Sequence, residues 1–390
     1  MFTLILFKSC INIKNMKIQV ATLIIESSET DSNLYYATKF TAPDPFIFLK
    51  IGDEQIMIMS DLEVDRAKEQ ARVDTVLSYA SYEGKVRKQG KADPKTIDVL
   101  HELLGERGIK VLVVPSYFGI RYALLLKDKG YHIEVKSDPF FEERINKSQE
   151  EVSYITDALR YSEDAIDKAI GFIRSTEIKG GYLYSGGKQV TSEDIKKLMV
   201  LYLMEHGFIA QHTIVSCGED TASPHNEGSG LLKSNTPIII DLFPRSVTNR
   251  YYADITRTVV KGIATKEVKN MYEAVRSAQE LAMSLLKNGV NGRDVHEALL
   301  QHFKDLGYES GEIDGRMQGF FHGTGHGVGL DVHEPPRISK KAETLYTGNV
   351  VTVEPGLYYS GVGGIRLEDM VVIQESGVIN LTNYPRILEV

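Results

Sequence analysis

Apolar residues between positions 18 and 141 recur with two different periods, and the two periods alternate along the chain. Short runs of β-branched and aromatic residues predict strands, whereas apolar residues spaced three and four apart predict helices. The predicted strands span residues 18–26, 45–51, 54–60, 75–81, 109–115 and 132–136. The predicted helices span residues 60–71, 96–108 and 119–130. This alternation is typical of an α/β domain built in layers.

The pattern changes after a charged segment at residues 138–148. Ser148 and Glu151 form a predicted capping box, Thr191 is a predicted N-cap and Gly207 a predicted helix stop. The predicted helices span residues 148–175, 191–207, 265–289 and 292–308. Predicted strands that are neighbours in sequence favour antiparallel hairpins with helices on one face, at residues 237–243, 254–260, 350–358 and 370–377.

These patterns predict two domains of different class. The first, residues 1–145, is a smaller α/β domain. The second, residues 146–390, is an α+β domain that carries polar residues on the inside of a curved sheet.

Composition narrows the class of protein. The 390 residues are 42% hydrophobic and 25% charged, which is typical of a globular protein with two packed units. The net charge of -8 is spread out without a basic stripe, which argues against nucleic-acid binding. Cys10 and Cys217 lie far apart and form no disulfide framework, so we predict a reducing, cytoplasmic environment.

An apolar run opens the chain within residues 1–20. It is too short to span a bilayer and no basic residue precedes it, which disfavours a signal peptide. Met16 is an alternative start, so the preceding residues are left out of the fold prediction. Since no later stretch predicts a transmembrane span, we expect no membrane partner.

The densest cluster of chemically active side chains lies in residues 322–336, HGTGHGVGLDVHEPP. Histidine and carboxylate groups at a glycine-rich bend suit a divalent metal ion. Glycines flank His326 on both sides, so we predict it as the single nitrogen ligand. His322 and His333 are predicted around the pocket, and His225 is a fourth candidate on a loop. We interpret the other six histidines as structural.

Four acidic residues stand in or beside apolar runs that predict strands. Asp241 follows three isoleucines, and Asp254 lies on the returning strand, so a hairpin could aim both carboxylates at one point. Glu354 and Glu368 are predicted inside strands, at residues 350–358 and 364–372. A buried carboxylate needs a cation, an arginine or a proton. The alternative interpretation is that each of the two aspartates merely ends a strand.

Taken in order, these residues resemble the pita-bread metallopeptidases, the family of creatinase, aminopeptidase P and prolidase, in its Xaa-Pro peptidase branch. The resemblance covers the whole second part, through His225, DITRT at Asp254, residues 322–336, VTVEPGLY and GIRLEDMVV. The first part resembles the creatinase-type N-terminal domain more loosely, through residues 32–49 and 61–67.

The resemblance implies a two-metal site. Asp241 holds one metal, Asp254 holds both, His326 binds the second, and Glu354 and Glu368 complete the shells. Mn2+ is the favoured ion, with Co2+, Zn2+ and Fe2+ as alternatives, and a hydroxide shared by the two metals attacks the scissile carbonyl.

The same resemblance implies roles for further residues. Glu354 passes a proton to the leaving nitrogen, while His225, His322 and His333 contact the substrate and stabilise the oxyanion. Arg366 either pins Asp241, which we favour, or clasps a substrate carboxylate.

The function implied is that of a Xaa-Pro aminopeptidase, acting on peptides with proline at the second position. A Xaa-Pro dipeptidase, or prolidase, is the main alternative. A creatinase-like amidinohydrolase and a non-catalytic binding module are disfavoured, because relatives of these kinds have typically lost metal ligands. Relatives also imply a homodimer.

The chain departs from the family pattern in two places. The segment between Asp241 and Asp254 is longer than usual, and Leu242 and Phe243 replace the customary small residue. This departure bears on substrate size more than on metal binding. The first domain also begins almost directly on a strand, without the usual opening helix.

Overall fold

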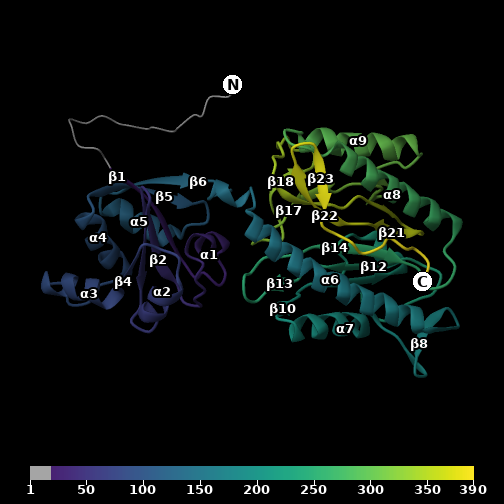
Figure 1. Cartoon of the computed structure of the whole chain (residues 1–390), viewed down its shortest axis with the longest axis horizontal. Helices are drawn as coiled ribbons and strands as arrows, with labels where there is room; N and C mark the ends of the chain where they lie inside the picture. The colour runs from purple at the N-terminus through teal and green to yellow at the C-terminus, as the bar shows by residue number, and fades with distance from the viewer. Residues whose placement is uncertain (1–18) are drawn as a thin grey trace. The chain divides into compact units, whose positions relative to one another are not determined.

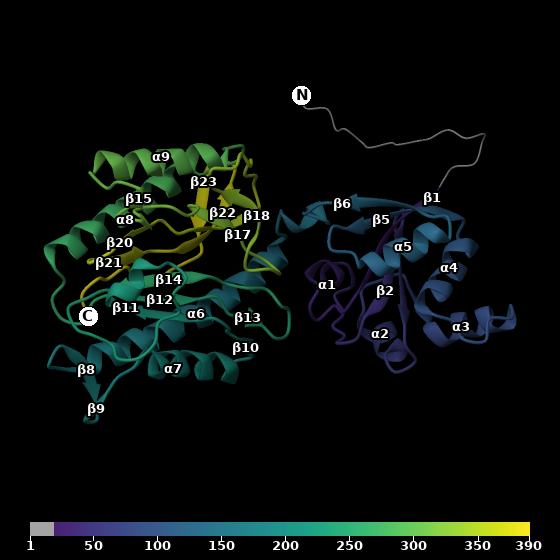
Figure 2. The same cartoon turned by 180° about the vertical axis from the view of Figure 1, so that it is seen from behind.

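The structure is a computed structural model that describes residues 19–390 and divides into two compact units. The first unit ends at Phe141 and the second runs from Glu142 to Val390, compared with the predicted boundary after residue 145. Figures 1 and 2 show each unit from two sides. The expectations for the opening apolar run, Met16 and Cys10 lie outside the described residues.

The first unit is an α/β domain around one mixed sheet of six strands, in the order β4-β3-β2-β1-β5-β6. Central strand β1 pairs antiparallel with β2 and parallel with β5. The strands are β1 (Gln19–Glu26), β2 (Phe46–Ile51), β3 (Glu54–Met59), β4 (Thr75–Ser78), β5 (Ile109–Pro115) and β6 (His132–Lys136). The helices are α1 (Ser32–Thr38), α2 (Val64–Gln70), α3 (Tyr79–Lys88), α4 (Thr96–Glu106) and α5 (Ile120–Asp128).

Helices cover both faces of this sheet because alternate strand residues point to opposite sides. In β1, Leu23 packs in the core that includes α4 and α5, whereas its neighbour Ile24 packs in the core that includes α1 and α2. The predicted layered α/β arrangement is therefore confirmed.

One local prediction in this unit was wrong, and helix α1 had not been predicted. Residues 75–81 do not form one strand, because the Ser78 hydroxyl accepts a hydrogen bond from the Ser81 N–H and starts α3 there. The sequence pattern also missed α1, whose first turn is capped by Asp31 through the N–H of Leu34 at 2.6 Å. In both cases a polar cap outweighed the apolar pattern.

Four long helices dominate the second unit, close to the predicted positions: α6 (Gln149–Ser175), α7 (Ser192–Glu205), α8 (Lys266–Leu285) and α9 (Gly292–Asp305). The predicted capping box of α6 is present. The Ser148 hydroxyl accepts from the Glu151 N–H at 3.2 Å, and the Glu151 carboxylate accepts from the Ser148 N–H at 2.8 Å. Thr191 caps α7, and Gly207 follows its end with a φ of 80°.

Antiparallel sheets form the middle of the second unit, in the orders β11-β12-β14, β18-β17-β19-β22-β23 and β20-β21. Helices α6 and α7 lie against the first sheet, and α8 and α9 lie against the other two, on the opposite side of the strands (Figures 1 and 2). The predicted α+β class is confirmed. The strands are β11 (Ile214–Cys217), β12 (Ile238–Leu242), β14 (Ile255–Val259), β17 (Gly325–Gly327), β18 (Glu334–Ile338), β19 (Val350–Val353), β20 (Gly356–Tyr359), β21 (Gly363–Arg366), β22 (Asp369–Gln374) and β23 (Gly377–Asn380).

Short strands complete the second unit as three small sheets, in the orders β7-β8-β9, β10-β13 and β15-β16. They are β7 (Glu177–Lys179), β8 (Tyr182–Ser185), β9 (Lys188–Gln189), β10 (Phe208–Ile209), β13 (Arg245–Ser246), β15 (Gly311–Ile313) and β16 (Arg316–Gln318).

Two predicted strands are each broken in two, which corrects the sequence analysis. Residues 350–358 form β19 and β20, separated by Glu354 and by Pro355, which has no N–H for a ladder. Residues 364–372 form the end of β21 and the start of β22, with Glu368 in the gap. The two breaks lie opposite each other. On one side of them β19 pairs with β22, and on the other side β20 pairs with β21. Both glutamates therefore lie where strands stop.

Within residues 19–390, every helix is too short or too polar to cross a membrane.

The cap of α6 provides a test of the fold. We expect Ser148→Ala to lower the free energy of unfolding by about 1 kcal/mol, because the Glu151 N–H loses its acceptor. Urea denaturation followed by circular dichroism measures the change. The matched control is Ser175→Ala at the other end of α6, where the hydroxyl bonds only the Phe172 carbonyl and a change within about 0.5 kcal/mol is expected. Equal losses in the two variants would contradict the capping role.

Candidate metal centre and its pocket

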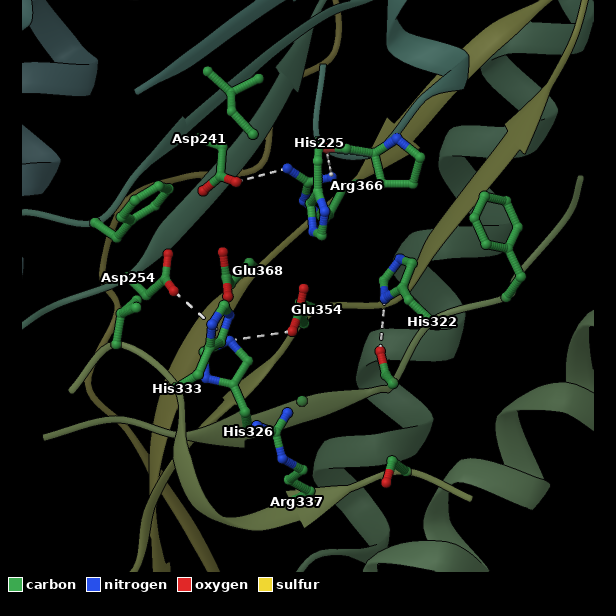
Figure 3. Close-up of a pocket in the computed structure, with 18 of the residues that line it drawn as sticks. His225, Asp241, Asp254, His322, His326, His333, Arg337, Glu354, Arg366 and Glu368 are labelled. Carbon is green, nitrogen blue, oxygen red and sulfur yellow. Dashed lines mark hydrogen bonds and ion pairs between the residues drawn. The ribbon is translucent and has the colours of Figure 1, made fainter. Parts of the chain in front are cut away.

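A pocket of about 820 Å³ lies within the second unit and gathers the sequence-predicted site residues. Figure 3 shows carboxylates and imidazoles pointing from several strands toward one central space. The predicted residues that line it are His225, Asp241, Asp254, His322, His326, His333, Glu354, Arg366 and Glu368.

The two aspartates come from one antiparallel pair of strands. Asp241 lies in β12 opposite Thr256 of β14, and Asp254 directly precedes β14. The two side chains therefore approach from facing strands, as predicted, although Asp254 stands just outside the ladder. Both are buried, with 8% and 4% of their surface exposed. Burial raises the pKa of Asp254 well above its usual range, and the charges of Glu368 and Asp241 raise it further.

The backbone N–H groups of the two glutamates donate hydrogen bonds to carbonyls of neighbouring segments. The Glu354 N–H donates to the Thr324 carbonyl at 2.8 Å, and the Glu368 N–H donates to the Thr256 carbonyl at 3.1 Å. The Thr256 hydroxyl also donates to the Glu368 carboxylate at 2.8 Å. Burial raises the pKa of Glu354 to about 8 and raises that of Glu368 well above its usual range.

His326 lies in β17 between two glycines that have no room for a side chain. A Cβ on Gly325 would meet the Thr352 carbonyl oxygen at 1.9 Å, and one on Gly327 would meet the Pro335 carbonyl oxygen at 2.5 Å. The His326 Nδ1 lies 3.1 Å from the Gly327 carbonyl, which only accepts, so Nδ1 carries the proton. Burial lowers the pKa of the ring to about 3, and Nε2 therefore keeps a free lone pair.

That lone pair faces the carboxylates. The His326 Nε2 lies 3.4 Å from Glu354 Oε1 and 3.8 Å from Asp254 Oδ2. Ligand atoms of Asp254, His326 and Glu368 all lie within 4.8 Å of one another. The Oδ1 of Asp241 is buried without a hydrogen-bond partner among the described residues. Crowded buried carboxylates, an unsatisfied oxygen and a neutral imidazole fit a divalent cation.

A chain of hydrogen bonds links Asp241 to His322. Arg366 Nη2 donates to Asp241 Oδ2 at 2.6 Å, and Arg366 Nη1 donates to the Tyr358 hydroxyl at 3.0 Å. The Tyr358 hydroxyl lies 3.0 Å from His322 Nε2, and His322 Nδ1 lies 2.7 Å from the Gly323 carbonyl. Nδ1 is therefore the protonated nitrogen, and Tyr358 donates to Nε2. Burial and the nearby Arg366 charge lower the pKa of His322 to about 3.

The two remaining predicted histidines also line the pocket. The ring of His333 lies 4.3 Å from that of His326, centroid to centroid, and the two rings are nearly perpendicular. His225 stands on the loop between the short helix at Gly218–Ala222 and β12. Figure 3 shows both residues among the side chains that line the pocket.

The sequence analysis missed several pocket residues. His212 and His296 line the pocket, although both histidines had been interpreted as structural. His296 Nδ1 lies 3.0 Å from the Thr324 hydroxyl, and its ring packs on Phe320. The helical pattern of α9 masked this histidine, since a buried helix face is normally a packing face.

Arg337 was also missed, although it stands four residues after His333. It lines the pocket, and its positive charge lowers the pKa of His326 and of His333. Among residues 19–390, no ion pair of its guanidinium is found, in contrast to Arg366. Its position close to the histidine cluster was the signal in the sequence that could have predicted its place in the pocket.

Comparisons with known proteins bear on this site. A family model described as metallopeptidase family M24 matches residues 153–375. The chain is 30% identical over 358 residues to the Xaa-Pro dipeptidase of Pyrococcus furiosus, covering 91% of this chain and 92% of that protein.

Solved structures extend the similarity to both units. The X-Pro aminopeptidase of Thermotoga maritima is 27% identical with a TM-score of 0.77, and the match covers 95% of this chain and 98% of that one. The prolidase of Pyrococcus horikoshii is 27% identical with a TM-score of 0.75, and the match covers 95% of each chain.

The crowded carboxylates predict a pH dependence of the metal-free protein. Glu354 ionises near 4.5 when unfolded but keeps its proton to about pH 8 when folded, so the unfolded state binds fewer protons between these values. The unfolded imidazoles of His322 and His326 titrate near 6.5, so above about pH 7.5 both rings are largely neutral in both states and oppose this effect only weakly.

We therefore expect the chelated protein to lose stability as pH rises from about 7.5 to 8.5, by at most about 1.4 kcal/mol per pH unit for each such carboxyl. Thermal denaturation at a series of pH values measures the loss. Glu354→Gln should flatten the dependence, and wild-type protein with saturating Mn2+ is the control in which it should be weaker. A chelated wild type whose stability does not change across this range would contradict the argument.

Proposed function

This chain belongs to metallopeptidase family M24, and from that premise we propose that it hydrolyses the peptide bond before a proline residue with the help of divalent metal ions. The observation that carries the proposal is the buried group of Asp254, His326 and Glu368, whose ligand atoms lie within 4.8 Å of one another. The Xaa-Pro specificity rests on relatives that are named Xaa-Pro dipeptidase, prolidase and X-Pro aminopeptidase.

We propose that five side chains hold two divalent ions: Asp241, Asp254, His326, Glu354 and Glu368. Mn2+ remains the favoured ion, with Co2+, Zn2+ and Fe2+ as alternatives. The unsatisfied oxygen of Asp241 supports its place in this set. Bound divalent ions lower the pKa of water from 15.7 to about 7 and so supply a nucleophile at neutral pH.

Residues around the ligands have separable roles in the proposal. Glu354 lies in the pocket with its Oε1 3.4 Å from His326 Nε2, and we assign it the transfer of a proton to the leaving nitrogen. His225 and His333 are assigned to the substrate carbonyl. His322 has both ring nitrogens engaged, so we assign it to hold Tyr358 and, through it, Arg366.

A proline ring suits the apolar part of the pocket. Ile214, Phe243, Phe321 and Val332 line it together with the charged groups. The imide nitrogen of an Xaa-Pro bond has no hydrogen, so it needs no acceptor from the enzyme. Phe243, which departs from the family pattern, brings an aromatic ring to this wall in a chain without tryptophan.

Whether the substrate is a dipeptide or a longer peptide is a separate question. The sequence alone favoured an aminopeptidase, whereas the position of Arg337 in the pocket favours a dipeptidase. Its guanidinium lines the pocket with Lys340 and Lys341, and no ion pair is found for it among the described residues. A free guanidinium near the histidines suits the terminal carboxylate of a dipeptide. The cytoplasmic location and the homodimer stay predictions from the sequence.

The metal proposal is tested by removing single ligands. Asp254→Ala and His326→Ala should each abolish both metal occupancy and turnover of Xaa-Pro substrates, because each removes a buried ligand. Occupancy is measured by elemental analysis and turnover by proline release. His132→Ala, in the first unit, is the matched control and should keep both. Full activity of the wild type after chelation and dialysis would contradict metal-dependent hydrolysis.

The dipeptidase proposal is tested by comparing a Xaa-Pro dipeptide with the matching Xaa-Pro amide. Arg337→Met should raise KM for a Xaa-Pro dipeptide by about tenfold or more, since a charge-assisted hydrogen bond is lost, and should leave KM for the matching Xaa-Pro amide unchanged. Arg293→Met, on the exposed face of α9, is the control variant. Two results together would support the aminopeptidase instead. The wild type would prefer a Xaa-Pro-Yaa peptide, and Arg337→Met would change KM equally for the dipeptide and its amide.

A further inference from the structure

One buried amide on α8 contacts both strand breaks at the metal centre. Gln279 is fully buried, and its Nε2 donates to the Val353 carbonyl at 2.8 Å and to the Leu367 carbonyl at 3.2 Å. These two carbonyls belong to the residues that directly precede Glu354 and Glu368. A single side chain therefore binds the backbone beside both glutamates.

The two carbonyls lie where one antiparallel ladder is interrupted. β19 pairs with β22 up to Val353, and β20 pairs with β21 from Gly356 onward. Leu367 lies in the gap between β21 and β22. At this junction the strand ladder is interrupted, and the two N–H groups of Gln279 take the place of ladder donors.

Both peptide units are also held from their other side. The Glu354 N–H donates to the Thr324 carbonyl, and the Glu368 N–H donates to the Thr256 carbonyl. In each peptide unit the carbonyl is thus fixed by Gln279 and the N–H by the backbone of a neighbouring segment. Because a peptide unit is planar, these bonds together set the direction in which each glutamate side chain leaves the backbone.

Packing alone does not account for an amide at this position. Gln279 lies among the apolar side chains that join α8 to the strands, and its Oε1 is buried without a hydrogen-bond partner among residues 19–390. Burying a polar atom without a partner is unfavourable, so an apolar side chain of the same size would suit this core better. The two donated hydrogen bonds are what the amide contributes.

We propose that Gln279 is a positioning residue that fixes the spacing and direction of Glu354 and Glu368 for metal binding. It acts through the backbone and touches neither substrate nor metal. The inference rests on the proposed function, since it presumes that these two glutamates are metal ligands. Residues that orient ligands from behind typically change metal affinity about 10- to 100-fold when removed.

The test is a titration of metal-free protein with Co2+, followed by its visible absorption, in wild type and in Gln279→Met. Methionine keeps the length and removes both donors, so we expect the Co2+ Kd to rise about 10- to 100-fold and the absorption bands to shift. Val275→Ala, buried one turn earlier on α8, is the matched control. It removes core volume, so it should lower the melting temperature and leave the Co2+ Kd and bands unchanged.

The outcomes are distinguishable. An unchanged Co2+ Kd in Gln279→Met, with a lower melting temperature as in Val275→Ala, overturns the inference. If Gln279→Met does not fold, Gln279→Glu decides, because a buried protonated carboxyl keeps one donor. A weaker Co2+ Kd in that variant supports the inference, and a wild-type Kd overturns it. A wild type that binds no Co2+ overturns the proposed function itself.

Discussion

Like charges confined to one buried space are the constraint on which the second unit depends. Asp254 and Glu368 are nearly inaccessible to water, and each lies close enough to the other carboxylates for their charges to raise its pKa. Without a cation such a group favours proton uptake, because burial and repulsion both disfavour the charged forms. A divalent ion would offset both penalties at once, so the proposed metal binding would also stabilise the fold.

Three of the five proposed metal ligands lie where regular structure stops. Asp254 directly precedes β14, and Glu354 and Glu368 lie in two adjacent breaks between sheets. Inside a continuous strand, side chains alternate between faces and their spacing is set by the ladder. At a break the backbone is free to aim a side chain elsewhere, but its polar groups need other partners. Thr324, Thr256 and Gln279 supply them.

The histidines obtain separate tasks from their hydrogen bonds. In His326 and His322 the Nδ1 donates to a backbone carbonyl, which leaves Nε2 as an acceptor in both rings. For His326 that nitrogen faces carboxylates, whereas for His322 it accepts from Tyr358. Both rings are neutral, and each donates from Nδ1 to the carbonyl of the next residue. These two histidines, four residues apart, therefore differ in chemistry only because different groups face their Nε2 atoms.

The sequence by itself determined the two-domain α/β and α+β organisation, the long helices of the second unit and the candidate side chains of the pocket. These features depend on local patterns: apolar periodicity, caps such as Ser148, and chemically active residues crowded among glycines. Pro355 was an available signal for the strand break at Glu354, but the break at Glu368 had none, because its apolar run reads the same whether the ladder continues or is interrupted. Only the tertiary structure decided that His296 reaches the pocket from α9 and that Gln279 spans both breaks. Each of these contacts joins residues far apart in the chain, and no local preference specifies which distant groups will meet.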